Sequence, residues 1–454
     1  MLKDLRYKGA IITDTGIPGE RKADGILPAH GNGALQVSRD RWILFASTLD
    51  PAGWDAVRSI VYQLRRDAPD GPVIREGVVC RYISGWNPLD LPVRLRKVHG
   101  MPMAFGVPKG ALLNGKPMPN QNAFAVKWYR RVLLEHDGRL YQSNPPSHRE
   151  VWPEGQEINR KLLRVEWMQF RLNEAEDDIE IVLPPQQLRQ KGYEEGDAFC
   201  SLEGADFMNH AMTPPVASDP SCTMWVECDT FASDPGHPNA THGQVAPVQY
   251  SWNAEARLYE WSRTGPLTGI RGRVIGETSI SRFGETWVVA ARTFDGKGET
   301  VWFRTGDPFQ GLGEPVIRPG SVCPRHSFRC ADGALRLFIN DGGRSPHRDR
   351  RNPLYVFEVD PITLEYSEPR TVVDLRAEGL PFDTPFADMC KLCPNQGNRQ
   401  LLFFRTIDRQ HTADLQPGED PLGNEALRAA GIHHAELVYD GEAPDPWSFE
   451  EVVS

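Results

Sequence analysis

The sequence lacks several features that mark well-known classes of protein. It has no run of about 18 apolar residues that could span a membrane as a helix, and its first residues have no apolar core typical of a secretory signal. The motifs G-x-x-x-x-G-K-[ST], H-E-x-x-H and G-x-S-x-G are also absent. We therefore expect a soluble protein with no membrane partner, cytoplasmic if the chain is full length and secreted or periplasmic if a leader was removed.

The sequence also has fewer basic than acidic residues, and it has few cysteines. Lys and Arg number 51 against 61 Asp and Glu, giving a net charge of −10, which argues against a nucleic-acid partner because such affinity depends on clustered cations. The eight Cys are scattered, so reduced thiols are expected rather than a disulfide framework. Structural zinc or calcium stays open, and the candidate metal ligands are Cys390 with Cys393, Cys323 and Cys330 around His326, and Cys222 and Cys228 with His242.

An internal repeat is the strongest positive signal. Segments 279–316 and 327–370 share one order of features: a strand, a tight turn at Gly, an apolar strand, a long polar loop, an apolar strand, an Asp-Pro turn and a Glu-Pro pair. Trp287 and Leu335 occupy equivalent positions 48 residues apart, close to the period of ~40–50 residues in propeller repeats. The pattern predicts four-stranded blades.

The fold class expected is therefore all-β: a single β-propeller domain over residues 1–454. Looser copies of the repeat occur on both sides of the two clearest ones, and 80–215 is the least regular region. Seven blades are favoured and six are the alternative. The expected blades are approximately 33–80, 81–150, 160–205, 214–265, 278–318, 326–375 and 388–454.

Polar loops on one end of this propeller form the candidate site. The loop between the second and third strands of a blade lies on the same end as the loop into the next blade, and these loops carry eight of the twelve His and many Arg. Imidazole exchanges protons near neutral pH, and guanidinium binds carboxylate or phosphate at two points. Together they indicate an anionic ligand.

Two stretches carry a family resemblance. Thr300–Phe309 and Arg351–Val356 resemble strands of sialidase-like propellers, a superfamily that includes sialidases, polysaccharide lyases and glycosidases. The Arg-Ile-Pro and S-x-D-x-G-x-T-W motifs of true sialidases are absent, so no sialidase catalytic residue is transferred. The loops rich in His and Arg at this end of the propeller are similar to those of the uronate-acting relatives, such as ulvan lyases. This resemblance implies an enzyme acting on an acidic glycan.

The first hypothesis is an enzyme that cleaves a glycosidic bond beside a uronate-type sugar. A lyase would use His or Tyr to take a proton while Arg stabilises the developing charge, whereas a hydrolase would use a pair of carboxylates. Neither route requires a cofactor. The second hypothesis is a non-catalytic propeller that binds a glycan or a protein, and the oligomeric state is open. Candidate catalytic residues are His30, His210, His326, Asp55 and Asp388, and candidate substrate-binding residues are Asn32, Arg58, His242, Arg292, Arg325, Arg344 and Arg405.

Overall fold

The computed structural model is built almost entirely of short antiparallel strands, and its helical elements include η1 (Lys22–Asp24), η2 (Pro421–Gly423) and α3 (Glu425–Ala429). No helix in the described part of the chain is long and apolar enough to cross a membrane. The residues that the structure describes are 1–49, 57–81, 94–98, 101–130, 132–136, 139–142, 164–194, 197–203, 205, 207–209, 211–232, 243–394, 396–409, 421–441 and 448–449.

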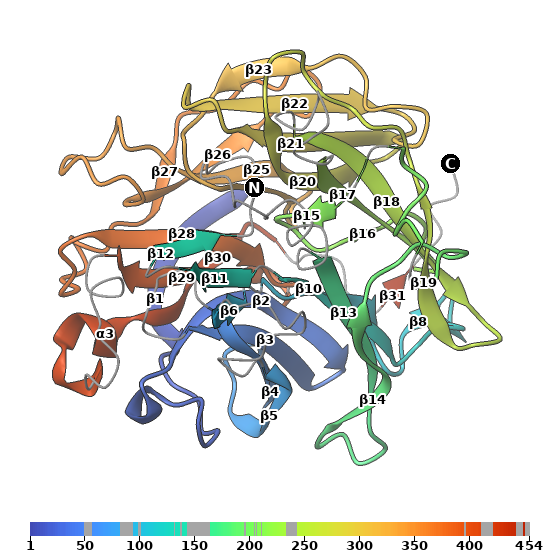
Figure 1. Cartoon of the computed structure of the whole chain (residues 1–454), viewed down its shortest axis with the longest axis horizontal. Helices are drawn as coiled ribbons and strands as arrows, with labels where there is room; N and C mark the ends of the chain where they lie inside the picture. The colour runs from blue at the N-terminus through green and yellow to red at the C-terminus, as the bar shows by residue number, and fades with distance from the viewer. Residues whose placement is uncertain are drawn as a thin grey trace.

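Six sheets surround a common centre and form a β-propeller (Figure 1). We number these sheets as blades in chain order, with the innermost strand of each blade first. Blade 1 is β2 (Leu27–Ser38), β3 (Arg41–Leu49), β4 (Val57–Arg66) and β5 (Val73–Arg81); blade 2 is β7 (Met103–Val107), β10 (Ala123–Arg130), β13 (Arg164–Leu172) and β14 (Ile179–Gln187); blade 3 is β15 (Phe207–Asn209) and β16 (Val216–Ala217), then β17 (Met224–Ala232), β18 (Gln244–Asn253) and β19 (Leu258–Thr264).

The second half of the propeller has the same plan, and its last blade is completed from the other end of the chain. β1 pairs with β30 from Leu2↔Tyr439 to Ile12↔Ile432, so the N-terminal strand is the outermost strand of blade 6. Blade 4 is β20 (Ile275–Phe283), β21 (Thr286–Thr293), β22 (Glu299–Thr305) and β23 (Val316–Pro319); blade 5 is β24 (Arg325–Arg329), β25 (Leu335–Asn340), β26 (Leu354–Val359) and β27 (Arg370–Val373); blade 6 is β28 (Pro385–Leu392), β29 (Arg399–Asp408), β30 (Gly431–Tyr439) and β1 (Leu2–Ile12).

The blade count is six, the alternative that the sequence left open, rather than the favoured seven. Two strands expected in separate blades, at 124–129 and 163–170, pair with each other as β10 and β13, beginning at Phe124↔Phe170. Three further strands join the sheet of blade 1 instead of forming a blade, because β6 contacts β4 at Val57↔Val98 and β11 pairs with β6. These are β6 (Arg94–Val98), β11 (Val132–His136) and β12 (Arg139–Gln142).

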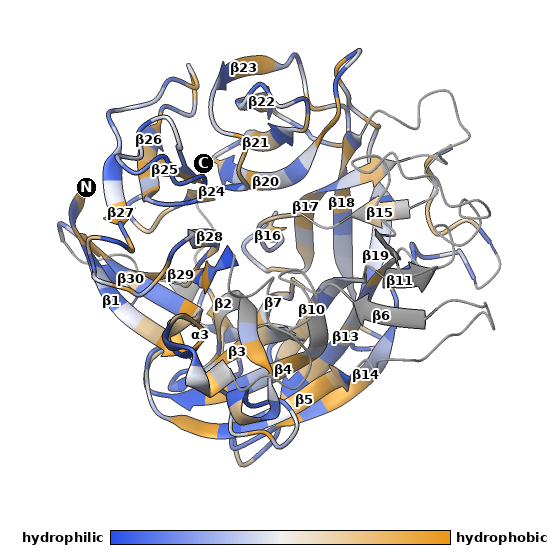
Figure 2. Ribbon diagram, turned by 60° about the vertical axis from the view of Figure 1, so that its left-hand side comes forward, coloured by the Kyte–Doolittle hydropathy of each residue, from blue (hydrophilic) through white to orange (hydrophobic). Residues whose placement is uncertain are grey.

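Each blade is apolar on both faces because it packs between two neighbours. In β21, Val289 and Ala291 contact the core shared with blade 3, whereas Val288 and Ala290 contact the core shared with blade 5. This alternation follows from the two-residue period of a strand. Figure 2 shows hydrophobic residues along strands such as β3 and β14 and many hydrophilic residues on the loops.

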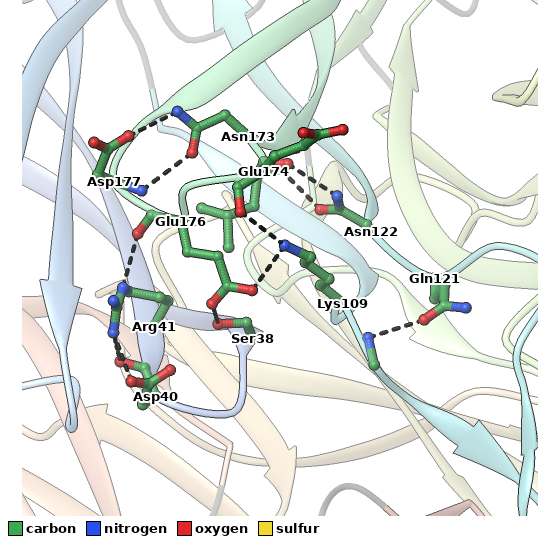
Figure 3. A network of polar contacts seen from close by, with 12 residues as sticks. Ser38, Asp40, Arg41, Lys109, Gln121, Asn122, Asn173, Glu174, Glu176 and Asp177 are labelled. Atoms are coloured by element: carbon green, nitrogen blue, oxygen red, sulfur yellow. Dashed lines mark hydrogen bonds and ion pairs between the residues drawn. The ribbon is translucent and has the colours of Figure 1, made fainter.

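We call the end at which the innermost strands begin the upper end, and the opposite end the lower end. At the lower end, Glu176 joins blades 1 and 2 (Figure 3): its carboxylate accepts from Ser38 at 2.7 Å and pairs with Lys109 at 2.8 Å, and its carbonyl accepts from Arg41 Nε at 2.8 Å. Connections between neighbouring blades therefore include charged pairs as well as apolar packing. A small sheet of β31 (Ser448–Phe449), β8 (Leu112–Leu113) and β9 (Lys116–Pro117) completes the strands.

Candidate functional site

Polar side chains from three successive blades meet where the innermost strands of blades 4, 5 and 6 begin. They come from β20, β21, β24, β28 and β29 and from the loop before β26. Their hydrogen bonds and ion pairs link the upper ends of these three blades. We call them the axial cluster, which consists of Glu277, Arg292, Arg325, His326, Arg351, Asp388, Lys391 and Arg405.

Glu277 and Arg292 form the most exposed pair of this cluster. The register of β20 shifts between Gly276 and Ser279, and Glu277 there has a left-handed φ of 50°. Arg292 Nη1 binds the Glu277 carboxylate at 2.7 Å, and its Nη2 donates to the Val322 carbonyl. The two side chains are 12% and 17% exposed, against 9% for Arg351 and 1% or less for Asp388 and Arg405. This pair is therefore the part of the cluster most accessible to solvent.

Arg325 is completely buried and holds the connection between blades 4 and 5. It donates to Thr300 Oγ1 at 2.8 Å, to the Cys323 carbonyl at 3.1 Å and to the carbonyls of Glu299 and Ser321. Burial, and then the charge of Arg292, lower the pKa of Arg325 to about 10. Both Nη atoms of Arg325 bind the protein, whereas its Nε has no hydrogen-bond partner among the described residues. Because the side chain is completely buried, Arg325 shapes the site rather than binding a ligand directly.

Asp388 lies between two arginines. Arg405 donates to its two oxygens at 2.7 and 2.9 Å, and Arg351 also binds it. Burial alone would raise the pKa of this carboxyl, but the two guanidinium groups hold the pKa at about 2. Asp388 is therefore an ionised, fully engaged carboxylate at neutral pH, and it has no proton to give.

His326 and Lys391 both contact one backbone oxygen, that of Met212. His326 Nδ1 lies 3.3 Å from it and Lys391 Nζ donates to it, while Met212 N donates to the Thr278 carbonyl at 2.6 Å. Burial lowers the pKa of Lys391 to about 7 and that of His326 well below its usual value. His326 Nε2 has no hydrogen-bond partner in the part of the chain that the structure describes.

Met212 occupies a break in the innermost strand of blade 3. β15 pairs with the end of β17 and β16 with its beginning, so the residues between them leave the sheet. The Met212 side chain packs with Met101, which precedes β7, and with Met389 of β28. Residues of blades 4, 5 and 6 and Met101, which precedes blade 2, thus all contact this one residue of blade 3, which fills part of the propeller centre.

A second buried polar group lies between blades 2 and 3. Lys127 of β10 binds Glu227 of β17 and lies 3.2 Å from Asp229, and Tyr250 of β18 donates its hydroxyl to Glu227. All four side chains are inaccessible to solvent. Burial, and then the charge of Glu227, raise the pKa of Asp229 well above its usual value.

Glu277, Lys391 and the three charged residues of this second group, Lys127, Glu227 and Asp229, were not predicted from the sequence. A usable signal existed for Lys127, a charged residue inside the otherwise apolar run Phe124–Tyr129. A further missed carboxylate, Glu20, is buried and accepts hydrogen bonds from Thr48, Ser59 and Arg81 at the upper end of blade 1. No local pattern distinguishes Glu20 or Glu277 from an ordinary loop carboxylate.

The predicted site residues fall into three sets. Arg292, Arg325, His326, Asp388 and Arg405 are brought together in the axial cluster. Arg344 is about half exposed and pairs with Asp341 at 3.2 Å, and no contact joins it to the cluster among the residues described. The side chains of His30, Asn32 and Arg58 are not described, although their backbone belongs to β2 and β4, and Asp55, His210 and His242 lie outside the described residues.

The candidate metal ligands among the cysteines are separated. Cys222 packs with Val107 and Met118, whereas Cys228 packs in the core between blades 3 and 4. All eight cysteines are free thiols, and within the described ranges no three His, Cys, Asp or Glu residues are grouped for a metal ion. His242, the third member of that proposed set, lies outside those ranges.

No protein-family model and no curated protein matches this sequence. Among solved structures, a protein of unknown function from Dyadobacter fermentans has 9% identity and a TM-score of 0.55, with 96% of this chain and 99% of that chain covered. Trypanosoma rangeli sialidase, alone and in complex with sialic acid, has 8% identity and a TM-score of 0.50 over 91% of this chain. The fold is a sialidase-like β-propeller. This propeller spans 54–55% of those sialidase chains.

Proposed function

We propose that this propeller is a carbohydrate-active enzyme that binds an anionic sugar at its upper end and cleaves the adjacent glycosidic bond. The substrate class is an acidic glycan of the uronate type or a similar carboxylate sugar. Cleavage proceeds by hydrolysis or by β-elimination, and the two routes differ in their products.

The observation that carries this proposal is the charge of the axial cluster. It contains four arginines against two carboxylates, Glu277 and Asp388, in a chain whose net charge is −10. Cations gathered in a low-dielectric region raise the local concentration of anions. Arg292 is the arginine of this cluster with the largest exposed fraction, so we assign to it the contact with the sugar carboxylate.

Proton transfer requires groups other than those described in the cluster. Asp388 is held ionised by two arginines, and His326 is buried against Met212. His30, Asp55 and His210 therefore stay the proposed proton donors or acceptors, on the basis of their residue types and places in the sequence.

A non-catalytic role is the second candidate. It is favoured by one observation, that both carboxylates of the axial cluster already pair with arginine. In this case the upper end would bind an acidic glycan or an acidic segment of a protein without breaking a bond.

The test is to incubate the protein with acidic oligosaccharides while reading ultraviolet absorbance near 235 nm and assaying new reducing ends. A rise in both indicates β-elimination, and reducing ends alone indicate hydrolysis. R292Q should abolish either signal, whereas R304Q, which changes an exposed arginine of the same blade at the lower end, should not. Binding by calorimetry without either signal would favour the second candidate, and an absence of binding as well would overturn both.

A further inference from the structure

Phe294 is an aromatic side chain exposed at the upper end of blade 4. It is 41% exposed and is the only Phe, Tyr or Trp among the exposed large hydrophobic residues in the part of the chain that the structure describes. It directly follows β21, which ends at Thr293, so it lies beside Arg292 at the upper end. An exposed aromatic ring next to the accessible ion pair of the axial cluster calls for an explanation other than core packing.

Neighbouring residues of blade 4 hold the Phe294 ring in place. Phe294 N donates to the Val274 carbonyl at 3.0 Å, and the Arg292 guanidinium carbon lies 4.7 Å from the ring centroid. A side chain at Gly276 would meet Thr230 at 2.8 Å and the Phe294 ring at 3.4 Å. Glycine at position 276 thus leaves room for the ring to pack against the sheet.

The loop that follows Phe294 is also fixed. Arg273 binds the Asp295 carboxylate at 2.7 Å and pairs with Glu299, and Asp295 Oδ1 accepts from Lys297 N at 3.1 Å. Ion pairs and backbone hydrogen bonds therefore hold the segment on both sides of the turn. A rigid ring loses little conformational entropy when a flat ligand stacks on it.

We propose that Phe294 is a stacking platform for a second sugar ring, next to the anionic unit bound by Arg292. This proposal rests on the proposed function and adds that the ligand has at least two units. The second unit is a pyranose with an apolar C–H face, because aromatic rings offer apolar area and a negative π face to such groups. Arg292 then joins the two subsites, since its guanidinium group contacts both the ring and the ion pair with Glu277.

The experiment is a chain-length series measured by calorimetry. The probes are the monosaccharides glucuronic acid and sialic acid and the di-, tri- and pentasaccharides that end in each. F294A should weaken binding of the longer probes by about five- to ten-fold, with less than two-fold change for the monosaccharides. F294W should retain its affinity for the longer probes. F294L, which keeps apolar bulk without a flat ring, should lose that affinity.

The chain offers a matched control in Phe309. Its ring also lies under a guanidinium group, that of Arg263 at 3.9 Å, but it follows β22 at the lower end of the same blade. F309A should leave all affinities unchanged, with folding of each variant checked by thermal unfolding. Failure of the wild type to bind every acidic monosaccharide and oligosaccharide would overturn the proposed function. Binding that is equal in wild type and F294L for every chain length would overturn the platform alone.

Discussion

Arg405 and Asp388 form a two-point ion pair inside blade 6, with nitrogen–oxygen distances of 2.7 and 2.9 Å. Both side chains are 1% exposed or less. A buried pair of this geometry compensates for the desolvation of its own charges, and Arg351 adds a second cation. Removing one partner leaves an uncompensated charge in the protein interior.

We therefore expect D388N to lower the free energy of unfolding by about 3–5 kcal/mol. Because the pKa of Asp388 is held at about 2, its contribution to stability is present above the unfolded pKa of about 4 and is lost as the pH falls toward 2. Urea unfolding between pH 2.5 and 7 measures both effects. E285Q, which changes a 96% exposed carboxylate, is the control. Equal stability of D388N and wild type at pH 7 would contradict the prediction.

Lys391 should make the free energy of unfolding depend on pH in the alkaline range. Burial lowers its pKa to about 7, so between about 7 and the unfolded value of about 10.4 the folded state binds fewer protons than the unfolded state. Stability associated with this group therefore rises with pH across that window and falls as the pH drops toward 7. Wild type should gain stability relative to K391M between pH 7 and 10. Urea unfolding measures this, with exposed K297M as the control, and parallel curves for wild type and K391M would refute it.

Asp229 should have the opposite effect and make the free energy of unfolding fall as the pH rises. Its raised pKa means that the folded state keeps a proton that the unfolded state releases above about 4. Its contribution is full below that pH and is lost as the pH rises through the folded value. D229N cannot lose this proton, so its stability should fall less than that of the wild type as the pH is raised. Denaturant titrations at a series of pH values test the difference, and identical slopes would count against a protonated Asp229.

Lys127 is the only cation that the structure places beside Glu227 and Asp229 among the described residues. K127M removes that cation but keeps the length of the side chain. The buried acidic pair then lacks its cation, so we expect a loss of about 3–5 kcal/mol in the free energy of unfolding. The double variant K127M/E227Q should recover part of this loss. A double variant no more stable than K127M would show that packing, rather than charge, explains the effect.

The repeat in the sequence was sufficient to predict the propeller. The segments at 279–316 and 327–370 correspond to blades 4 and 5, because a blade packed on both faces needs the same run of apolar strands each time. The blade number could not be predicted as well. Strands in 81–205 have the composition of blade strands, but β6 and β11 add to the sheet of blade 1 through pairings distant in sequence.

The site was predictable to the extent that polar residues at strand ends face one end of a propeller. This rule found Arg292, Arg325, His326, Asp388 and Arg405, which do meet. It could not indicate which of them are buried or already paired. That depends on Met212, whose place at the centre results from the break between β15 and β16 and from contacts with other blades, and no local pattern at 211–215 records it.

In blade 6, β1 pairs with β30, although more than 400 residues of chain separate these two strands. At a ribosomal rate of about 5–20 residues per second, β1 waits roughly 20–90 s for its partner. During that time β1 is an unpaired strand, and its polar backbone groups are open to other chains. Blades 1 to 5 can form in order as they leave the ribosome, but the ring closes only after β30 has been synthesised. Protection of the nascent β1 strand therefore matters more to this protein than to one whose blades are each continuous in sequence.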